Sequence, residues 1–160
     1  MEQSDIVIIG AGPAGLYCAI HVAAPGFRVL VLEKNEHPGS KLLLSGSGQC
    51  NLTHEGDIRS FLLHYGDHGK FVKPSLMSCT NRALTTFFEE RGLPMVPEES
   101  GKIFPQTKNA EDVLAILLAE CSKKGVTIRC GEPVVAVSRE NGLFIARTPT
   151  GSYAAPALVI

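Results

Sequence analysis

The sequence predicts an α/β fold in which helices flank a parallel sheet and an antiparallel β-meander is added near the end. The apolar run Ile6–Ile9 leads directly into the glycine spacing G-x-G-x-x-G and then into an apolar helical pattern over Pro13–Ala24. The run Arg28–Leu32 is apolar almost throughout, which is typical of a parallel strand buried on both faces. An Asn-Gly pair at 141–142 lies between two apolar runs and indicates a β-hairpin.

The glycines after the first strand predict a binding site for the pyrophosphate of a dinucleotide. Gly10 allows the chain to turn sharply, Gly12 allows the backbone to approach a phosphate, and Gly15 allows the helix to pack closely on the sheet. The helix N-terminus offers unpaired N–H groups to the phosphates, and Pro13 suits the first helical position. We therefore expect these residues and Ala14 to contact the cofactor.

The second strand ends in Glu33, about 20 residues beyond the glycines. A carboxylate at this distance accepts hydrogen bonds from the ribose hydroxyls of an adenosine. The alternative is a charge that simply marks the end of a strand. Because the glycine pattern precedes it, we favour the ribose role for Glu33 and expect its neighbour Lys34 to lie at the same site.

A second glycine-rich segment lies within Lys34–Gly56, which we expect to be loop-like. Its part Ser45–Thr53 combines flexible glycines with hydroxyl and amide side chains. Such a segment can wrap a phosphate or the polar edge of a ring, and it can equally be a plain surface loop. Composition alone leaves both alternatives open.

The remaining elements follow from apolar periodicity and from helix and turn signals. The helical predictions are Asp57–Tyr65 and Phe71–Cys79, both weak, Arg82–Arg91 with Asn81 as N-cap and Gly92 as stop, and Ala110–Lys124. The strand predictions are Asp5–Gly10, Leu93–Val96, Lys102–Phe104, Val126–Arg129, Val134–Arg139, Leu143–Thr148, Ser152–Ala154 and Ala157–Ile160. The three strands from Val134 to Ala154 form the predicted meander.

Composition and charge exclude several classes of protein. The 160 residues carry a net charge of −1 without a basic stripe, which argues against a nucleic-acid partner. No apolar run is long enough to cross a bilayer, and the five cysteines are scattered without a C-x-x-C. These features predict a cytoplasmic protein without a disulfide framework or a membrane partner. His64 and His68 are four residues apart, but their glycine-broken surroundings give no reason to expect a metal site.

The last predicted strand ends at Ile160 without a turn or a polar cap. We expect from this that residues 1–160 are one domain from the N-terminal part of a longer protein. A sheet that lacks its next strand exposes an apolar face and an edge, so we also expect the chain to associate with itself.

Together, the strand, glycine turn, helix, acidic strand end and meander resemble the FAD-binding half of flavoproteins that contain two dinucleotide-binding domains. The loop segment narrows the resemblance. Lys34-Asn35, Pro38-Gly39 and the run from Lys41 to Thr53 are similar to the signature of the YhiN/BaiN-like bacterial flavoproteins, and Ile103-Phe104-Pro105 is similar to a second patch of that family. The resemblance implies a Rossmann-like FAD-binding domain that is incomplete at its C-terminus.

The resemblance also implies which residues bind the cofactor. It places Lys41 and the loop near the pyrophosphate and the flavin, and Val134 near the adenine. The loop residues concerned are Ser45, Gly46, Gly48, Gln49, Cys50 and Asn51. For Cys50 we favour packing over redox chemistry, because no resolving thiol is adjacent. The sequence departs from the family at Ser40 and Gln49, where arginine is usual, and at Ser47, where glycine is usual.

The function that the resemblance implies is that of an FAD-dependent oxidoreductase. Hydride would pass between a nicotinamide cofactor such as NAD(P)H, the FAD and an unsaturated small-molecule substrate. No arrangement in the sequence demands a catalytic role, and we expect the catalytic residues beyond Ile160. Two alternatives remain open: a truncated, non-catalytic nucleotide-binding module, and an NAD-binding dehydrogenase domain.

Overall fold

A four-stranded parallel sheet forms the centre of the first of two compact units in the chain. The structure, a computed structural model, describes residues 1–160. The first unit comprises Met1–Leu43 and Leu114–Ile160, and the second comprises Leu44–Val113, so that the boundaries fall inside α2 and α6. The sheet has the order β11-β2-β3-β7. Its strands are β2 (Ile6–Ile9), β3 (Val29–Leu32), β7 (Thr127–Arg129) and β11 (Ala157–Val159).

The predicted strands and helices of this unit are confirmed. All four residues of β3 are buried, as the continuous apolar run predicted. Helix α1 (Pro13–Val22) follows β2, and α6 (Ala110–Lys123) precedes β7. The two helices meet where the Cys121 thiol donates to the Leu16 carbonyl across 3.7 Å. The side chain of Ile8 points from β2 toward α1, so the helix covers that face of the sheet.

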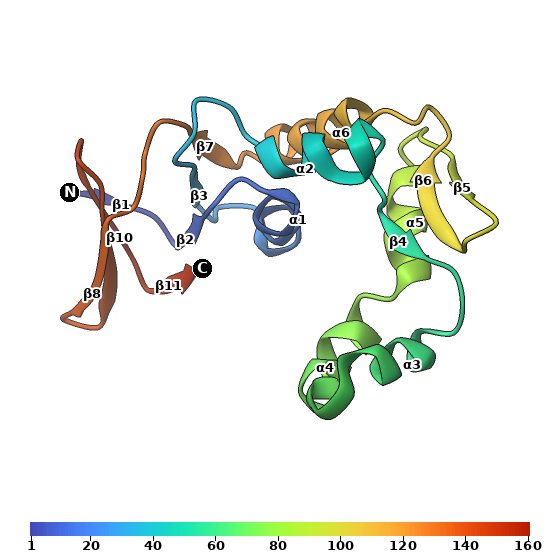
Figure 1. Cartoon of the computed structure of the whole chain (residues 1–160). Coiled ribbons are helices and arrows are strands. Elements are labelled where there is room, and N and C mark those ends of the chain that lie inside the picture. Colours follow the sequence, from blue (N-terminus) through green and yellow to red (C-terminus); the bar gives the residue numbers. More distant parts are fainter. The chain divides into compact units, whose positions relative to one another are not determined.

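The meander forms a second sheet that packs on the parallel one. Strands β8 (Ala136–Glu140), β9 (Leu143–Arg147) and β10 (Ser152–Ala155) pair antiparallel as predicted, and β1 (Glu2–Gln3) adds in parallel to β10. The core between the sheets contains Val7, Leu30, Leu32, Ala146, Tyr153 and Ala155. The first unit therefore has helices, a parallel sheet and the meander sheet in successive layers (Figure 1).

The second unit combines a small antiparallel sheet with short helices (Figure 1). The sheet has the order β4-β6-β5, with β4 (Thr53–His54), β5 (Met95–Pro97) and β6 (Lys102–Pro105). The helical elements are η1 (Ser45–Gly48), α3 (Ile58–Phe61), η2 (Leu62–His68), α4 (Gly69–Ser78) and α5 (Asn81–Glu89). Neither unit contains a helix with the length and apolar character needed to span a bilayer.

Two local predictions are wrong. The segment Lys34–Gly56 is not all loop, because it contains α2 (Ser40–Leu44), η1 and β4. Asn81 is not the N-cap of α5. Thr80 takes that place, and its hydroxyl accepts from the Ala83 N–H at 3.1 Å. The buried Asn81 amide instead donates to the backbone carbonyls of His54, the last residue of β4, and of Gly56 in the β4–α3 connection, which the local sequence could not show.

Candidate functional site

The glycine turn between β2 and α1 has the geometry that its spacing predicted. Gly10 has φ +105°, in the region that favours glycine, and its N–H donates to the Leu32 carbonyl at 2.7 Å. A Cβ built on Gly15 would lie 2.0 Å from the Gly10 carbonyl oxygen. The turn and the helix are therefore in direct backbone contact, and only glycine fits at position 15.

The N-terminus of α1 is open to a ligand. Gly12 is its N-cap, with no side-chain cap and no acidic residue in the first turn, and Pro13 follows at N1. A Cβ built on Gly12 would meet no atom within 4 Å. Pro13 and Ala14 are exposed. Free N–H groups, a positive dipole end and open space together suit a phosphate group.

The carboxylate of Glu33, a buried residue with 6% of its surface exposed, is hydrogen-bonded to this turn. One oxygen accepts from the Ala11 N–H at 2.7 Å. The other accepts from the backbone N–H of Asn35 at 2.9 Å and from its side-chain amide at 2.7 Å. The sequence pattern selected Glu33 but did not predict that its carboxylate accepts hydrogen bonds from Ala11 and Asn35. For Asn35 the sequence did contain a signal, because an asparagine two residues after an acidic strand end often forms such a local hydrogen bond.

The other cofactor-binding residues predicted in the first unit are Val134, Lys34 and Lys41. Val134 precedes β8 and packs, partly buried, against the core between the two sheets. Lys34 is exposed beside Glu33. Lys41 is exposed on α2, whose start is tied to the turn because the Gly39 N–H donates to the Ala11 carbonyl at 2.9 Å.

The signature loop, Ser45–Asn51, belongs to the second unit and has an unusual backbone. Gly46, Ser47, Gly48 and Cys50 all have positive φ, with values of 55°, 57°, 84° and 60°. Two of these residues carry side chains, for which the left-handed region costs roughly 1–2 kcal/mol per residue. Strained backbone of this kind gathers at ligand-binding sites, where the surrounding structure holds it in place.

The ring of Phe104 in β6 packs against the loop. A Cβ on Gly46 would lie 3.0 Å from the Phe104 ring and 2.9 Å from the Asn51 backbone nitrogen. The Lys108 ammonium lies 4.2 Å from the centre of the same ring and is paired with Glu98. The sequence placed Phe104 in a predicted strand and in a patch shared with the family, but gave it no contact with the loop. The packing of its ring against the loop is a long-range contact that no local pattern reveals.

Cys50 is a buried thiol within the loop, with 1% of its surface exposed. Burial raises the pKa of Cys50 above its ordinary value, and a hydrogen bond from Ser45 opposes this only in part. The group therefore stays protonated at neutral pH, where a thiol is a weak nucleophile. This environment suits packing, and the Cys50 N–H also closes the loop by donating to the Ser45 carbonyl at 3.0 Å.

We expect Ser47→Gly to stabilise the chain by about 0.5–1 kcal/mol. Glycine removes the cost of the left-handed conformation, and the greater freedom of the unfolded chain offsets part of the gain. Urea unfolding of the two proteins measures the difference. Ser45→Gly is the matched control, because Ser45 is not among the residues with positive φ. Equal or lower stability of Ser47→Gly would contradict the prediction.

The chain matches the family described as HI0933-like protein Rossmann domain over residues 4–160. It is 31% identical over 144 residues to the ribosomal RNA dihydrouridine synthase of Escherichia coli (strain K12), covering 90% of this chain and 35% of that protein. It is 30% identical over 160 residues to the 3-dehydro-bile acid delta(4,6)-reductase of Clostridium scindens, covering 99% of this chain and 38% of that protein. The chain thus spans just over a third of the length of these relatives.

Solved structures support the fold. The 3-ketosteroid-delta4-(5alpha)-dehydrogenase of Rhodococcus jostii RHA1 superposes with a TM-score of 0.66 at 16% sequence identity, covering 98% of this chain and 44% of that one. At this identity the likeness shows the fold alone. The family match and the two relatives confirm the resemblance to the YhiN/BaiN-like proteins, while the roles of the individual site residues stay predictions. The chain belongs to the HI0933-like Rossmann domain family.

Proposed function

We propose that the chain is the FAD-binding part of a flavin-dependent reductase. The observation that carries the proposal is the bond between Glu33 and the Ala11 N–H. This hydrogen bond connects a carboxylate that suits a ribose to the turn before a helix N-terminus that suits a pyrophosphate. The antiparallel meander and the strained signature loop favour FAD over NAD as the dinucleotide.

In this proposal the bound flavin supplies hydride transfer, and the residues of this chain bind and orient it. Gly10, Gly12 and Gly15 keep the turn open for the pyrophosphate. The N–H groups at the start of α1 neutralise the phosphate charge, and Glu33 accepts from the ribose hydroxyls. NAD(P)H is the proposed hydride donor.

For the substrate we propose a small molecule with a carbon–carbon double bond conjugated to a carbonyl. The names of the two relatives supply the support: a uridine and a 3-dehydro-delta(4,6) bile acid both contain such a double bond. The E. coli relative is named for ribosomal RNA, whereas this chain has a net charge of −1 and no basic stripe. Charge therefore favours a small molecule over RNA for this part of the protein.

Titration of the chain with FAD, followed by flavin fluorescence and calorimetry, tests the cofactor. We expect FAD to bind and NAD to bind more weakly. Tighter binding of NAD than of FAD would support the dehydrogenase alternative. If the chain binds neither FAD nor NAD, the proposal is wrong. Oxidation of NAD(P)H in the presence of FAD and an enone would count against the non-catalytic alternative. Light scattering of the same samples tests the predicted self-association.

A further inference from the structure

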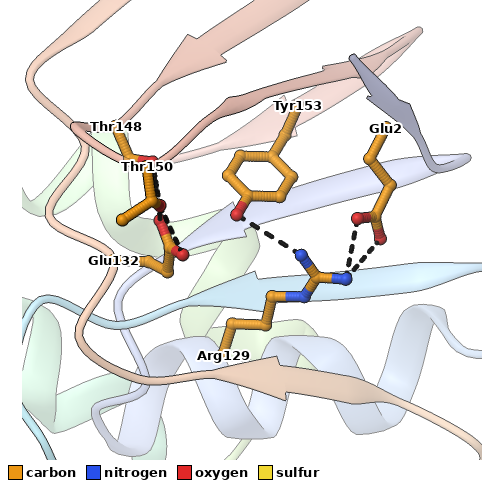
Figure 2. Close-up of polar contacts among 6 residues, drawn as sticks. All are labelled: Glu2, Arg129, Glu132, Thr148, Thr150 and Tyr153. Carbon is orange, nitrogen blue, oxygen red and sulfur yellow. Dashed lines mark hydrogen bonds and ion pairs between the residues drawn. The ribbon is translucent and has the colours of Figure 1, made fainter.

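Arg129, the last residue of β7, connects the parallel sheet to the meander sheet (Figure 2). Its guanidinium donates to the Tyr153 hydroxyl at 3.4 Å and pairs with the Glu2 carboxylate at 2.7 Å. The guanidinium carbon also lies 5.5 Å from the centre of the Tyr153 ring. Tyr153 is buried in the core between the sheets, so Arg129 is fixed at one end by a rigid partner.

Glu132 makes a second connection three residues later (Figure 2). Its carboxylate accepts from the Thr148 hydroxyl at 2.6 Å and from the Thr150 hydroxyl at 2.6 and 2.7 Å. Hydrogen bonds from these two hydroxyls lower the pKa of Glu132, with smaller contributions from Tyr153 and Arg129. The carboxylate is therefore held in its charged form by the connection between β9 and β10.

The backbones of the same two residues enclose the peptide groups of Glu33. The Glu33 N–H donates to the Arg129 carbonyl at 2.8 Å, and the Glu33 carbonyl accepts from the Glu132 N–H, also at 2.8 Å. Both hydrogen bonds of the Glu33 main chain thus go to residues whose side chains are bound to the meander, Arg129 to β10 and Glu132 to the β9–β10 connection. A continuous chain of hydrogen bonds and covalent bonds thus connects the meander to the Glu33 carboxylate.

We propose that Arg129 and Glu132 are positioning residues for Glu33, and that through it they set the affinity for the adenosine end of the cofactor. This inference rests on the proposed function. Neither residue is assigned to contact the cofactor. Both act by fixing the backbone from which the ribose-binding carboxylate projects, because a carboxylate must be held closely to accept two hydroxyl hydrogen bonds.

A purely stabilising role fits the connections less well. The side chains of Arg129 and Glu2 are 41% and 43% exposed, and an ion pair at such exposure contributes little to stability. Thr150 is exposed as well. Their loss should leave the chain folded, while the Glu33 carboxylate gains freedom to move away from its partners.

A double-mutant cycle between Glu132 and Glu33 tests the inference. Glu132→Ala is expected to weaken FAD binding by about fivefold, the factor that corresponds to one hydrogen bond. Combined with Glu33→Gln, the same substitution should have almost no further effect, because the group that it positions is already altered. Arg129→Met should behave in the same way. Glu132→Gln, which keeps one acceptor oxygen, should restore most of the affinity.

Thr127→Val on the same strand is the matched control and should leave FAD binding unchanged. Thermal unfolding without FAD shows whether each variant is folded. Each substitution is compared in the native chain and in the Glu33→Gln variant. If Glu132→Ala and Arg129→Met weaken FAD binding by the same factor in both, the effects are additive and the inference is wrong. It is equally wrong if neither variant weakens binding. Absence of FAD binding by the native chain would overturn the proposed function itself, which is a distinct outcome.

Discussion

Gly15→Ala is expected to destabilise the chain by about 3 kcal/mol and to abolish cofactor binding. The added Cβ would lie 2.0 Å from the Gly10 carbonyl oxygen. Because the obstructing atom belongs to the backbone, α1 has to move away from the turn, and the packing of the helix on the sheet is lost. Overpacking of a close-packed contact costs about 1–3 kcal/mol, and a backbone clash lies at the upper end. Urea unfolding monitored by circular dichroism measures the loss.

Gly12→Ala is the matched control for this prediction. A Cβ at position 12 would meet nothing within 4 Å, and Gly12 has an ordinary φ of −77°. We expect the unfolding free energy without cofactor to change by less than about 1 kcal/mol, the cost of a poorer helix cap. FAD binding should nevertheless weaken at least about tenfold, because the methyl group occupies the space where the pyrophosphate approaches. Equal stabilities of the two variants would refute the assigned packing role of Gly15.

Replacement of Glu33 has the second largest expected effect. Glu33→Ala removes the acceptor for the Ala11 N–H and for both Asn35 donors, and leaves a cavity at a buried position. Leaving buried donors unpaired costs about 1–3 kcal/mol, so we expect a loss of about 2–3 kcal/mol in the free energy of unfolding. Glu33→Gln keeps one oxygen acceptor and should cost less.

The same replacements should weaken FAD binding by about ten- to a hundredfold, the range for hydrogen bonds to a charged acceptor. Glu36→Gln is the matched control, because Glu36 is an exposed carboxylate in the same connection. Calorimetric titration of the variants with FAD gives the comparison. If Glu33→Gln binds FAD as tightly as the native chain, the ribose role of Glu33 is wrong, whatever its effect on stability.

The centre of the fold could be predicted because its signals are local. The strand β2, the glycine turn and α1 follow one another without interruption. The positive φ of Gly10 and the close contact at Gly15 are requirements that the glycine pattern records. Glu33 was selected as a candidate site residue in the same way, by its spacing from the turn. The hairpin at 141–142 was indicated by two residues that favour positive φ, and both Asn141 and Gly142 have it.

What the sequence did not reveal depends on distant partners or on backbone angles. Strand β1 has two residues, too few for a periodic pattern, and exists because it pairs with β10 at the far end of the chain. The ring of Phe104 under Gly46 and the left-handed angles of Ser47 and Cys50 are set by packing within the second unit. The anchoring of Arg129 and Glu132 joins segments that no motif connects.

The pairing of β11 with β2 has a consequence for the order in which the protein is made. Ala157–Val159 pairs with Ile6–Ile8, so the apolar segment of β2 gains this neighbour only after more than a hundred further residues have been synthesised. Contacts of such long sequence separation slow folding and leave strands exposed in the meantime. The glycine turn is therefore synthesised long before β11 can pair with β2, and chaperone binding during translation should concentrate on the β2 segment.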